Sequence, residues 1–253
     1  MRKLIMVTAV LFLSAGQLIP SWVETKQRRH ILAATVMISI AVPNWLETAG
    51  TVADALPIPN DEYRTIARAD GELIADGLGT LVAHGDEALL VTHDHWSRFD
   101  EVLGRVTFWA ADGVWLAEME LRDFKRHVRY RDGGTMVLTA PNMLTTAVSG
   151  KAEALQTNAL KIDDSVLLAQ RAGNRIVLTE ATVVAQSEKQ ARPAVRLQTA
   201  NGQAVVGGDS GGGVWVNGRL AATMWTTIMM ENTESGERRS TDISVAAVFS
   251  HMP

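Results

Sequence analysis

A glycine-rich run around one serine is the segment of this sequence best suited to covalent chemistry. Residues 207–213 read GGDSGGG, with Ser210 at the centre. A nucleophilic serine needs a tight turn that exposes its hydroxyl, and glycines permit the backbone angles of such a turn. The backbone N–H groups beside it can stabilise the oxyanion that forms when a carbonyl is attacked. The run predicts a serine nucleophile; the alternative is a glycine-rich β-turn with an incidental serine.

Two histidines could supply the base that such a serine requires. His93 and His95 lie two residues apart, with Asp94 between them. Residues two apart on a strand face the same side, so this trio could also begin a metal site. No third ligand stands at a convincing spacing, and we expect neither a metal nor another cofactor.

The serine run resembles the nucleophile signature of the chymotrypsin-like (trypsin-like) serine protease family. Residues 88–96, ALLVTHDHW, are similar to the family's strand ending in Val-Thr-Ala-Ala-His, which puts the catalytic histidine on His95 and leaves His93 as the rival base. The run GLGTLV at 77–82 is similar to a segment that opens the first barrel in bacterial members. The resemblance implies two antiparallel six-stranded β-barrels with the active site between them. It also implies hydrolysis of a polypeptide substrate without a cofactor.

The same resemblance implies roles for residues around the nucleophile. The backbone N–H groups of Gly208 and Ser210 would hold the oxyanion. Ala204, six residues before the serine, would form the floor of the specificity pocket and favour a small to medium apolar side chain. The segment of Trp225 and Thr226 would pair with the substrate backbone.

The third member of the predicted triad is a carboxylate. In the family it precedes a short apolar strand, and Asp132 in the run RDGGTMVL is the nearest match. Its spacing differs by about two residues, which a bulge at Gly133 and Gly134 could absorb. Asp123 is the second candidate, and its alternative is a solvated charge in a basic run.

Asp209 matches a family residue that, in animal members, pairs with a new amino terminus after activation. The sequence has no Ile-Val-Gly-Gly segment for that pairing, so we expect Asp209 to make an ion pair or hydrogen bond within the protein. The irregular spacing of Asp132 and the His-Asp-His run motivate a different hypothesis, an inactive homologue that acts as an extracytoplasmic binding module. An esterase or acyl transferase on the same fold is a further alternative.

Short runs of β-forming residues separated by Gly, Asp and Asn fill the chain from about residue 71 onward and predict an all-β barrel or sandwich. The predicted strands span 78–83, 88–92, 105–110, 114–121, 135–139, 165–169, 175–178, 181–186, 194–198, 213–216, 220–227 and 243–248. The stretch 141–161 could connect two subdomains, at about 70–140 and 160–250.

Two apolar stretches near the start have the pattern of export signals. Residues 4–20 follow a basic pair, and residues 31–43 follow the basic run 26–30. We expect residues 1–55 to direct export and residues 56–253 to form a secreted or extracytoplasmic protease domain. A membrane tether through one stretch is an alternative, and buried core elements are another.

Composition excludes several further classes of function. The chain has 253 residues, 47% of them apolar, enough for one large domain or two small ones. It contains no cysteine, which excludes disulfides and a thiol nucleophile. The net charge of -4 gives no basic surface for a polyanion, so we expect no nucleic-acid partner.

Overall fold

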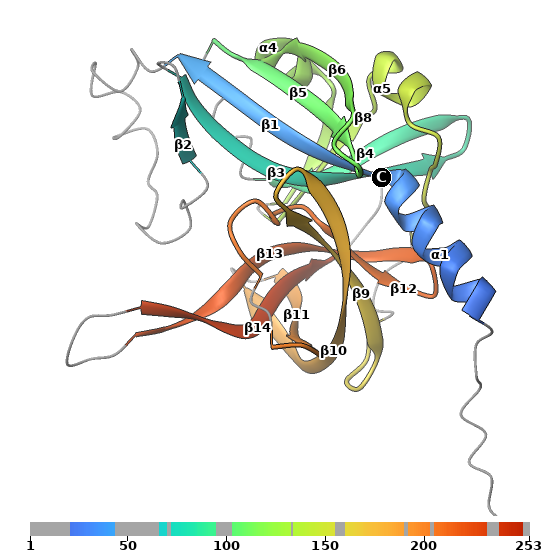
Figure 1. The fold of residues 1–253 in the computed structure, drawn as a ribbon, viewed down its shortest axis with the longest axis vertical. Helices are drawn as coiled ribbons and strands as arrows, with labels where there is room; N and C mark the ends of the chain where they lie inside the picture. The colour runs from blue at the N-terminus through green and yellow to red at the C-terminus, as the bar shows by residue number, and fades with distance from the viewer. Residues whose placement is uncertain are drawn as a thin grey trace, which may run out of the picture.

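The chain forms two β-structures, one above the other in Figure 1, and both are visible in this computed structural model. The structure describes residues 21–43, 66–69, 72–94, 103–132, 134–154, 160–189, 192–202, 205–231 and 238–249. The upper structure uses strands between residues 35 and 139, and the lower one uses strands between residues 165 and 248.

The first half is one curved sheet of eight strands. The strands are β1 (Thr35–Pro43), β2 (Ile66–Ala69), β3 (Glu72–His84), β4 (Glu87–His93), β5 (Arg105–Ala110), β6 (Trp115–Glu120), β7 (Val128–Arg131) and β8 (Thr135–Thr139). Their order is β6-β5-β1-β3-β4-β8-β7, and β2 pairs with β3. The short helix α4 (Leu121–Arg126) joins the two end strands, and its Phe124 packs against Phe108 of β5.

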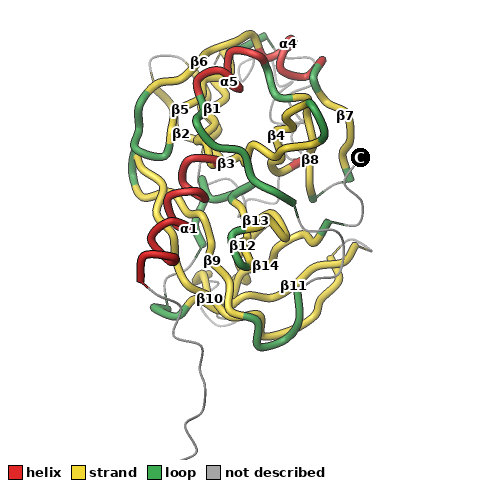
Figure 2. Tube along the Cα trace, turned by 90° about the vertical axis from the view of Figure 1, so that its right-hand side faces the viewer, coloured by secondary structure: helices red, strands yellow, loops and turns green. Residues whose placement is uncertain are grey.

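The second half is a closed six-stranded barrel. Its strands are β9 (Ser165–Ala172), β10 (Arg175–Lys189), β11 (Arg192–Thr199), β12 (Gly213–Val216), β13 (Arg219–Glu231) and β14 (Arg238–Val248). They close in the order β10-β11-β14-β13-β12-β9, and the turned view in Figure 2 shows them below the first sheet. Alternate side chains point inward to a core that includes Leu168, Val183 and Met224.

The segment between the halves is bonded to both of them. It contains the helix α5 (Asn142–Ala147), and then Ala152 forms a bridge with Val82 of β3 while Ala154 forms one with Leu220 of β13. The expectation that 141–161 connects two subdomains therefore agrees with the described part of this segment.

The helix α1 (Ser21–Ala34) and strand β1, which precede the expected domain start at residue 56, pack with the described fold. β1 pairs with β3 on one side and β5 on the other, and Ile38 and Ile40 are fully buried in the first core. Ile31 of α1 is buried against residues of both halves. A short run that is apolar throughout fits a strand buried on both faces as well as an export signal.

The predicted all-β fold with two halves is confirmed, although the first half is an open eight-stranded sheet and not a closed barrel of six. Strands β5, β8 and β12 have the predicted limits, and the segments 175–178 and 181–186 are parts of one strand, β10. The sequence analysis did not predict β1, β2, β7 or the helices.

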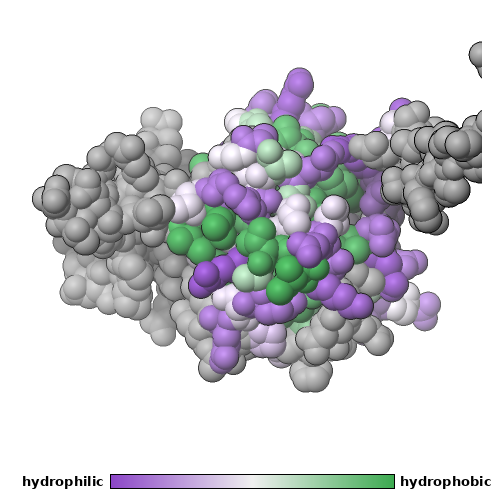
Figure 3. Space-filling model, turned by 90° about the horizontal axis from the view of Figure 1, so that it is seen from below, coloured by the Kyte–Doolittle hydropathy of each residue, from purple (hydrophilic) through white to green (hydrophobic). Residues whose placement is uncertain are grey.

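The lower face of the molecule is not uniformly polar. Figure 3 shows apolar residues in a band bordered by hydrophilic ones. Among the described residues of the second half, Ile162, Val177 and Val206 are large apolar residues with exposed surface. Within the described part of the chain, no helix is both long and apolar enough to cross a membrane.

Candidate active site

Ser210 lies on a tight turn that is fastened to both halves of the molecule. The turn precedes β12, and Gly208 within it has a φ of 98°. The carbonyl of Ser210 accepts a hydrogen bond from the backbone N–H of Leu78 on β3, at 2.8 Å. The pairing of β3 with β4 ends at Gly79, which lies opposite Thr92. The residue before Gly79, Leu78, bonds to the serine turn instead.

Two backbone donors of this turn have no acceptor within the part of the chain that the structure describes. Among the described residues, the N–H groups of Gly208 and Ser210 make no hydrogen bond. The side chain of Ser210 is partly exposed, whereas Gly208 and Asp209 are buried. Free amides beside a partly exposed hydroxyl are the groups that an oxyanion site requires.

The glycine after the serine is required by close packing. Gly211 has a φ of 84°, and a Cβ atom there would lie 2.2 Å from the carbonyl oxygen of Leu78 and 2.6 Å from Oγ1 of Thr92. The same Thr92 hydroxyl donates to the Leu78 carbonyl at 2.6 Å. The serine turn, β3 and the end of β4 are thus in direct contact.

Asp209 is fully buried and is held by hydrogen bonds within the protein, as the sequence analysis expected. Its Oδ1 accepts from the backbone N–H of Arg171 at 2.5 Å. Its Oδ2 accepts from the N–H of Val206 at 2.9 Å and from Nε2 of Gln170 at 3.3 Å. Burial raises the pKa of the Asp209 carboxyl to about 6, and the hydrogen bonds from Arg171, Val206 and Gln170 limit that rise.

Asp132 lies where β4 ends and β8 begins. β4 and β8 are antiparallel, and His93 at the end of β4 is opposite Thr135. Asp132 precedes that strand in a closed turn, in which its Oδ1 accepts from the N–H groups of Gly134 at 2.9 Å and Thr135 at 2.7 Å. The side chain is buried beside the end of β4, and its Oδ2 accepts from the Tyr130 hydroxyl at 3.4 Å.

His93 is buried in the contact between the two halves. Its ring lies 5.9 Å from that of Trp225 on β13, at an interplanar angle of 56°. This packing accounts for a histidine at a position where the family has a small residue. Within the described residues, no group of three or more metal-ligating side chains is close enough to hold an ion.

The other predicted site residues have different outcomes. Asp123 is on α4, where its carboxylate pairs with Arg126 at 2.9 Å and its side chain is 43% exposed. This environment is that of the solvated charge named as the alternative. His95 and Ala204 lie outside the described residues. Trp225 and Thr226 are on β13, where the register with β14 shifts between Met224 and Thr226.

Three contributors to the site were missed by the sequence analysis: Leu78, Gln170 and Arg171. Leu78 lies in the run GLGTLV, which the sequence analysis noted as a segment similar to the family's first barrel and not as a partner of Ser210. Nothing in the local sequence of β9 indicates that Gln170 and Arg171 meet Asp209, since 38 residues separate Arg171 from it.

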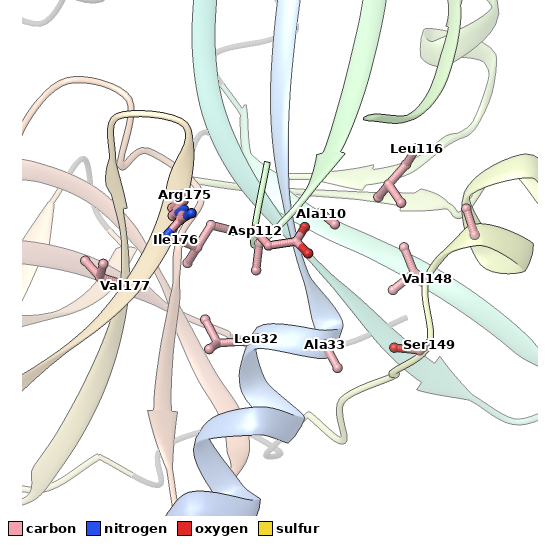
Figure 4. A pocket seen from close by; sticks show the side chains of 12 residues that line it. Leu32, Ala33, Ala110, Asp112, Leu116, Val148, Ser149, Arg175, Ile176 and Val177 are labelled. Atoms are coloured by element: carbon pink, nitrogen blue, oxygen red, sulfur yellow. The ribbon is translucent and has the colours of Figure 1, made fainter. Parts of the chain in front are cut away.

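A separate groove lies between the two halves beside α1 (Figure 4). Its cavity is about 550 Å³ and is lined mainly by apolar side chains, among them Leu32, Leu116, Val148 and Ile176. Asp112 and Arg175 add one charge of each sign. None of its lining residues belongs to the serine turn or to the Asp132 turn.

The fold is similar to that of chymotrypsin-like serine proteases. The structure is similar to that of the Rv3671c protease from M. tuberculosis in its active form, with 12% identity, a TM-score of 0.53, and coverage of 90% of this chain and 82% of that one. It is also similar to the HtrA-type protease AlgW with a tripeptide (14% identity, TM-score 0.51, 88% of this chain and 59% of that chain). Deg5 is a third similar structure (15% identity, TM-score 0.50, 82% and 86%).

At these identities the similarity establishes the fold alone. No protein-family model matches the sequence. No curated protein sequence matches it either.

Proposed function

We propose that this chain is a serine endopeptidase that uses Ser210 as nucleophile, His95 as base and Asp132 as the carboxylate that orients the base. The observation that carries this proposal is the convergence of three segments. The Ser210 turn is bonded to Leu78, Leu78 is bonded to Thr92 near the end of β4, and β4 ends beside the strand that Asp132 precedes. Protease folds among the similar solved structures support the reaction class.

Covalent geometry supports the choice of His95. It follows His93 by two residues, a distance of at most about 7 Å along the chain. The proposal requires the His95 side chain to reach both the Asp132 turn and Ser210. His93 itself is packed against Trp225, a structural role that leaves the base to the next histidine.

The proposed reaction has two halves. Ser210 Oγ attacks the peptide carbonyl carbon while its proton passes to the imidazole of His95, and the N–H groups of Gly208 and Ser210 hold the oxyanion. The C–N bond then breaks as the imidazolium gives its proton to the leaving amine. Water attacks the acyl-enzyme, its proton passes to the imidazole, and the ester C–O bond breaks as Ser210 recovers a proton.

Labelling with a fluorophosphonate probe tests this function. The wild-type protein should form one adduct, on Ser210, and Ser210→Ala should abolish it without lowering thermal stability. His95→Ala should remove labelling, and the rate should fall below about pH 6–7 as the imidazole is protonated. An unlabelled wild-type protein would favour the inactive binding module. Comparing the hydrolysis of a peptide and an ester that carry the same side chain then distinguishes a peptidase from an esterase.

We infer an extracytoplasmic location, with residues 4–20 as the export signal. This apolar stretch follows the basic pair Arg2 and Lys3, as an export signal does, whereas residues 31–43 lie in α1 and β1. A C-terminal reporter active only outside the cytoplasm should be active with the full chain and inactive when residues 4–20 are deleted. Reporter activity that survives this deletion would contradict the proposal.

A further inference from the structure

A chain of polar contacts connects the serine turn to the opposite half of the molecule through one arginine. The Asp209 carboxylate, which precedes Ser210, receives two of its three hydrogen bonds from consecutive residues of β9, the Gln170 side chain and the Arg171 backbone. The position of the turn therefore depends on the position of this part of β9.

The side chain of Arg171 extends the connection from β9 to the first sheet. Its Nη1 lies 2.5 Å from Oδ2 of Asp76 on β3, and its Nε donates to the carbonyl of Gly173 at 2.8 Å. The other oxygen of Asp76 accepts a hydrogen bond from the Ser39 hydroxyl on β1. Each side chain of this ion pair thus makes a second polar contact.

The same strand β3 reaches the turn at a second point. Asp76 and Leu78 are two residues apart, so they lie on the same face of the strand. Leu78 bonds directly to the carbonyl of Ser210, while Asp76 acts through Arg171 on Asp209. Two adjacent residues of the turn are therefore attached to one strand of the opposite half.

We propose that Arg171 is a positioning residue, which makes the geometry of the Ser210 turn depend on the contact between β9 and β3. This inference rests on the proposed function where it concerns rate. The ion pair is partly exposed, with side-chain exposures of 29% and 22%, so it contributes little to global stability. Its loss should change the turn far more than it changes the folding equilibrium.

The experiment compares Arg171→Ala, Asp76→Ala and their double variant with the control Arg129→Ala. Arg129 pairs with Glu87 at 2.7 Å, and both residues lie within the first sheet. We expect Arg171→Ala to reduce the fluorophosphonate labelling rate and kcat about tenfold or more, with little change in KM or Tm. The double variant should be no slower than the slower single variant, Arg171→Lys should recover part of the rate, and Arg129→Ala should match wild type.

Amide hydrogen exchange gives a readout that does not need activity. Exchange in peptides covering residues 205–213 should increase in Arg171→Ala, while peptides from β11 and β14 should be unchanged. If the wild-type protein is not labelled but this exchange increases, the proposed function fails and the positioning role stands. Unchanged exchange in the turn, or a wild-type labelling rate in Arg171→Ala, would overturn the inference.

Discussion

The hydroxyl oxygens of Thr135 and Thr223 lie 2.9 Å apart, and both side chains are buried. Thr135 is the first residue of β8 and its backbone N–H donates to Asp132, whereas Thr223 is on β13 of the barrel. This hydrogen bond joins the two halves next to the proposed catalytic carboxylate.

Replacing one threonine of this pair should lower the unfolding free energy more than replacing both. Thr135→Val or Thr223→Val leaves one buried hydroxyl without a partner, which costs about 1–3 kcal/mol of unfolding free energy. The double variant replaces both partners with side chains of similar shape and should be closer to wild type. Urea denaturation of the four proteins measures this coupling, and additive losses would contradict it.

Asp132→Asn should remove most of the activity while preserving the turn. The amide oxygen of asparagine can still accept from Gly134 and Thr135, but the group can no longer stabilise an imidazolium. We expect kcat to fall by about four orders of magnitude. Asp123→Asn is the matched control, because that carboxylate is exposed and pairs only with Arg126 among the contacts described. Equal activities in the two variants would exclude Asp132 from the triad.

Asp209 should make the protein more stable near pH 4 than at pH 7. Its folded-state pKa of about 6 lies above the ordinary value of 3.8, so the folded state binds the proton more tightly. Its contribution is therefore fully present below about pH 4 and is lost as pH rises to about 6, an effect of roughly 3 kcal/mol at most. The positive charge of Arg171 lowers the pKa of Asp209 and so limits this effect.

Asp209→Asn carries no titrating proton and provides the comparison. The difference in unfolding free energy between wild type and this variant should change between pH 4 and pH 6 and stay constant above that range. Denaturation curves at several pH values test this. A constant difference across the whole range would show that Asp209 titrates normally. A pH dependence of labelling that remains in Asp209→Asn comes from the histidine base and not from Asp209.

Gly211→Ala should disrupt the serine turn through a steric clash. The new Cβ atom would lie 2.2 Å from the Leu78 carbonyl oxygen, in a backbone conformation with a φ of 84°. Gly202→Ala is the control, since its φ of 67° imposes similar backbone strain with nothing within 4 Å of the new atom. We expect the control to lose about 1–2 kcal/mol, and Gly211→Ala to lose more and to label slowly. Similar stability and labelling in both variants would contradict the packing at Leu78.

Ile38→Ala tests whether β1 is part of the folded protein. Ile38 is fully buried, so removing its methyl groups should cost about 2–5 kcal/mol of unfolding free energy. Val177→Ala, at a side chain 38% exposed, should change stability by about 0.5 kcal/mol or less. An unchanged denaturation midpoint for Ile38→Ala would contradict the burial of β1 and favour residues 31–43 as part of the export region.

Local sequence could predict most of the strands but not the contacts between them. β5, β8 and β12 were found because turn residues border short β-rich runs, as in the turn at Asn217 and Gly218. The serine turn was found because its glycines are consecutive in sequence. The Arg171–Asp209 and Leu78–Ser210 hydrogen bonds join residues distant in sequence, and no local periodicity encodes them.

The central place of β1 in the first sheet has a consequence for maturation. Residues 53–55, Ala-Asp-Ala, form a small-x-small pattern that a signal peptidase could cut after Ala55. Such a cut would break the chain between β1 and β2. The piece before the cut would keep its pairing with β3 and β5 and its buried apolar side chains, and so would stay with the larger piece. Mass spectrometry under native conditions would then find a nicked two-chain protein at full mass, and only denaturation would separate the fragments.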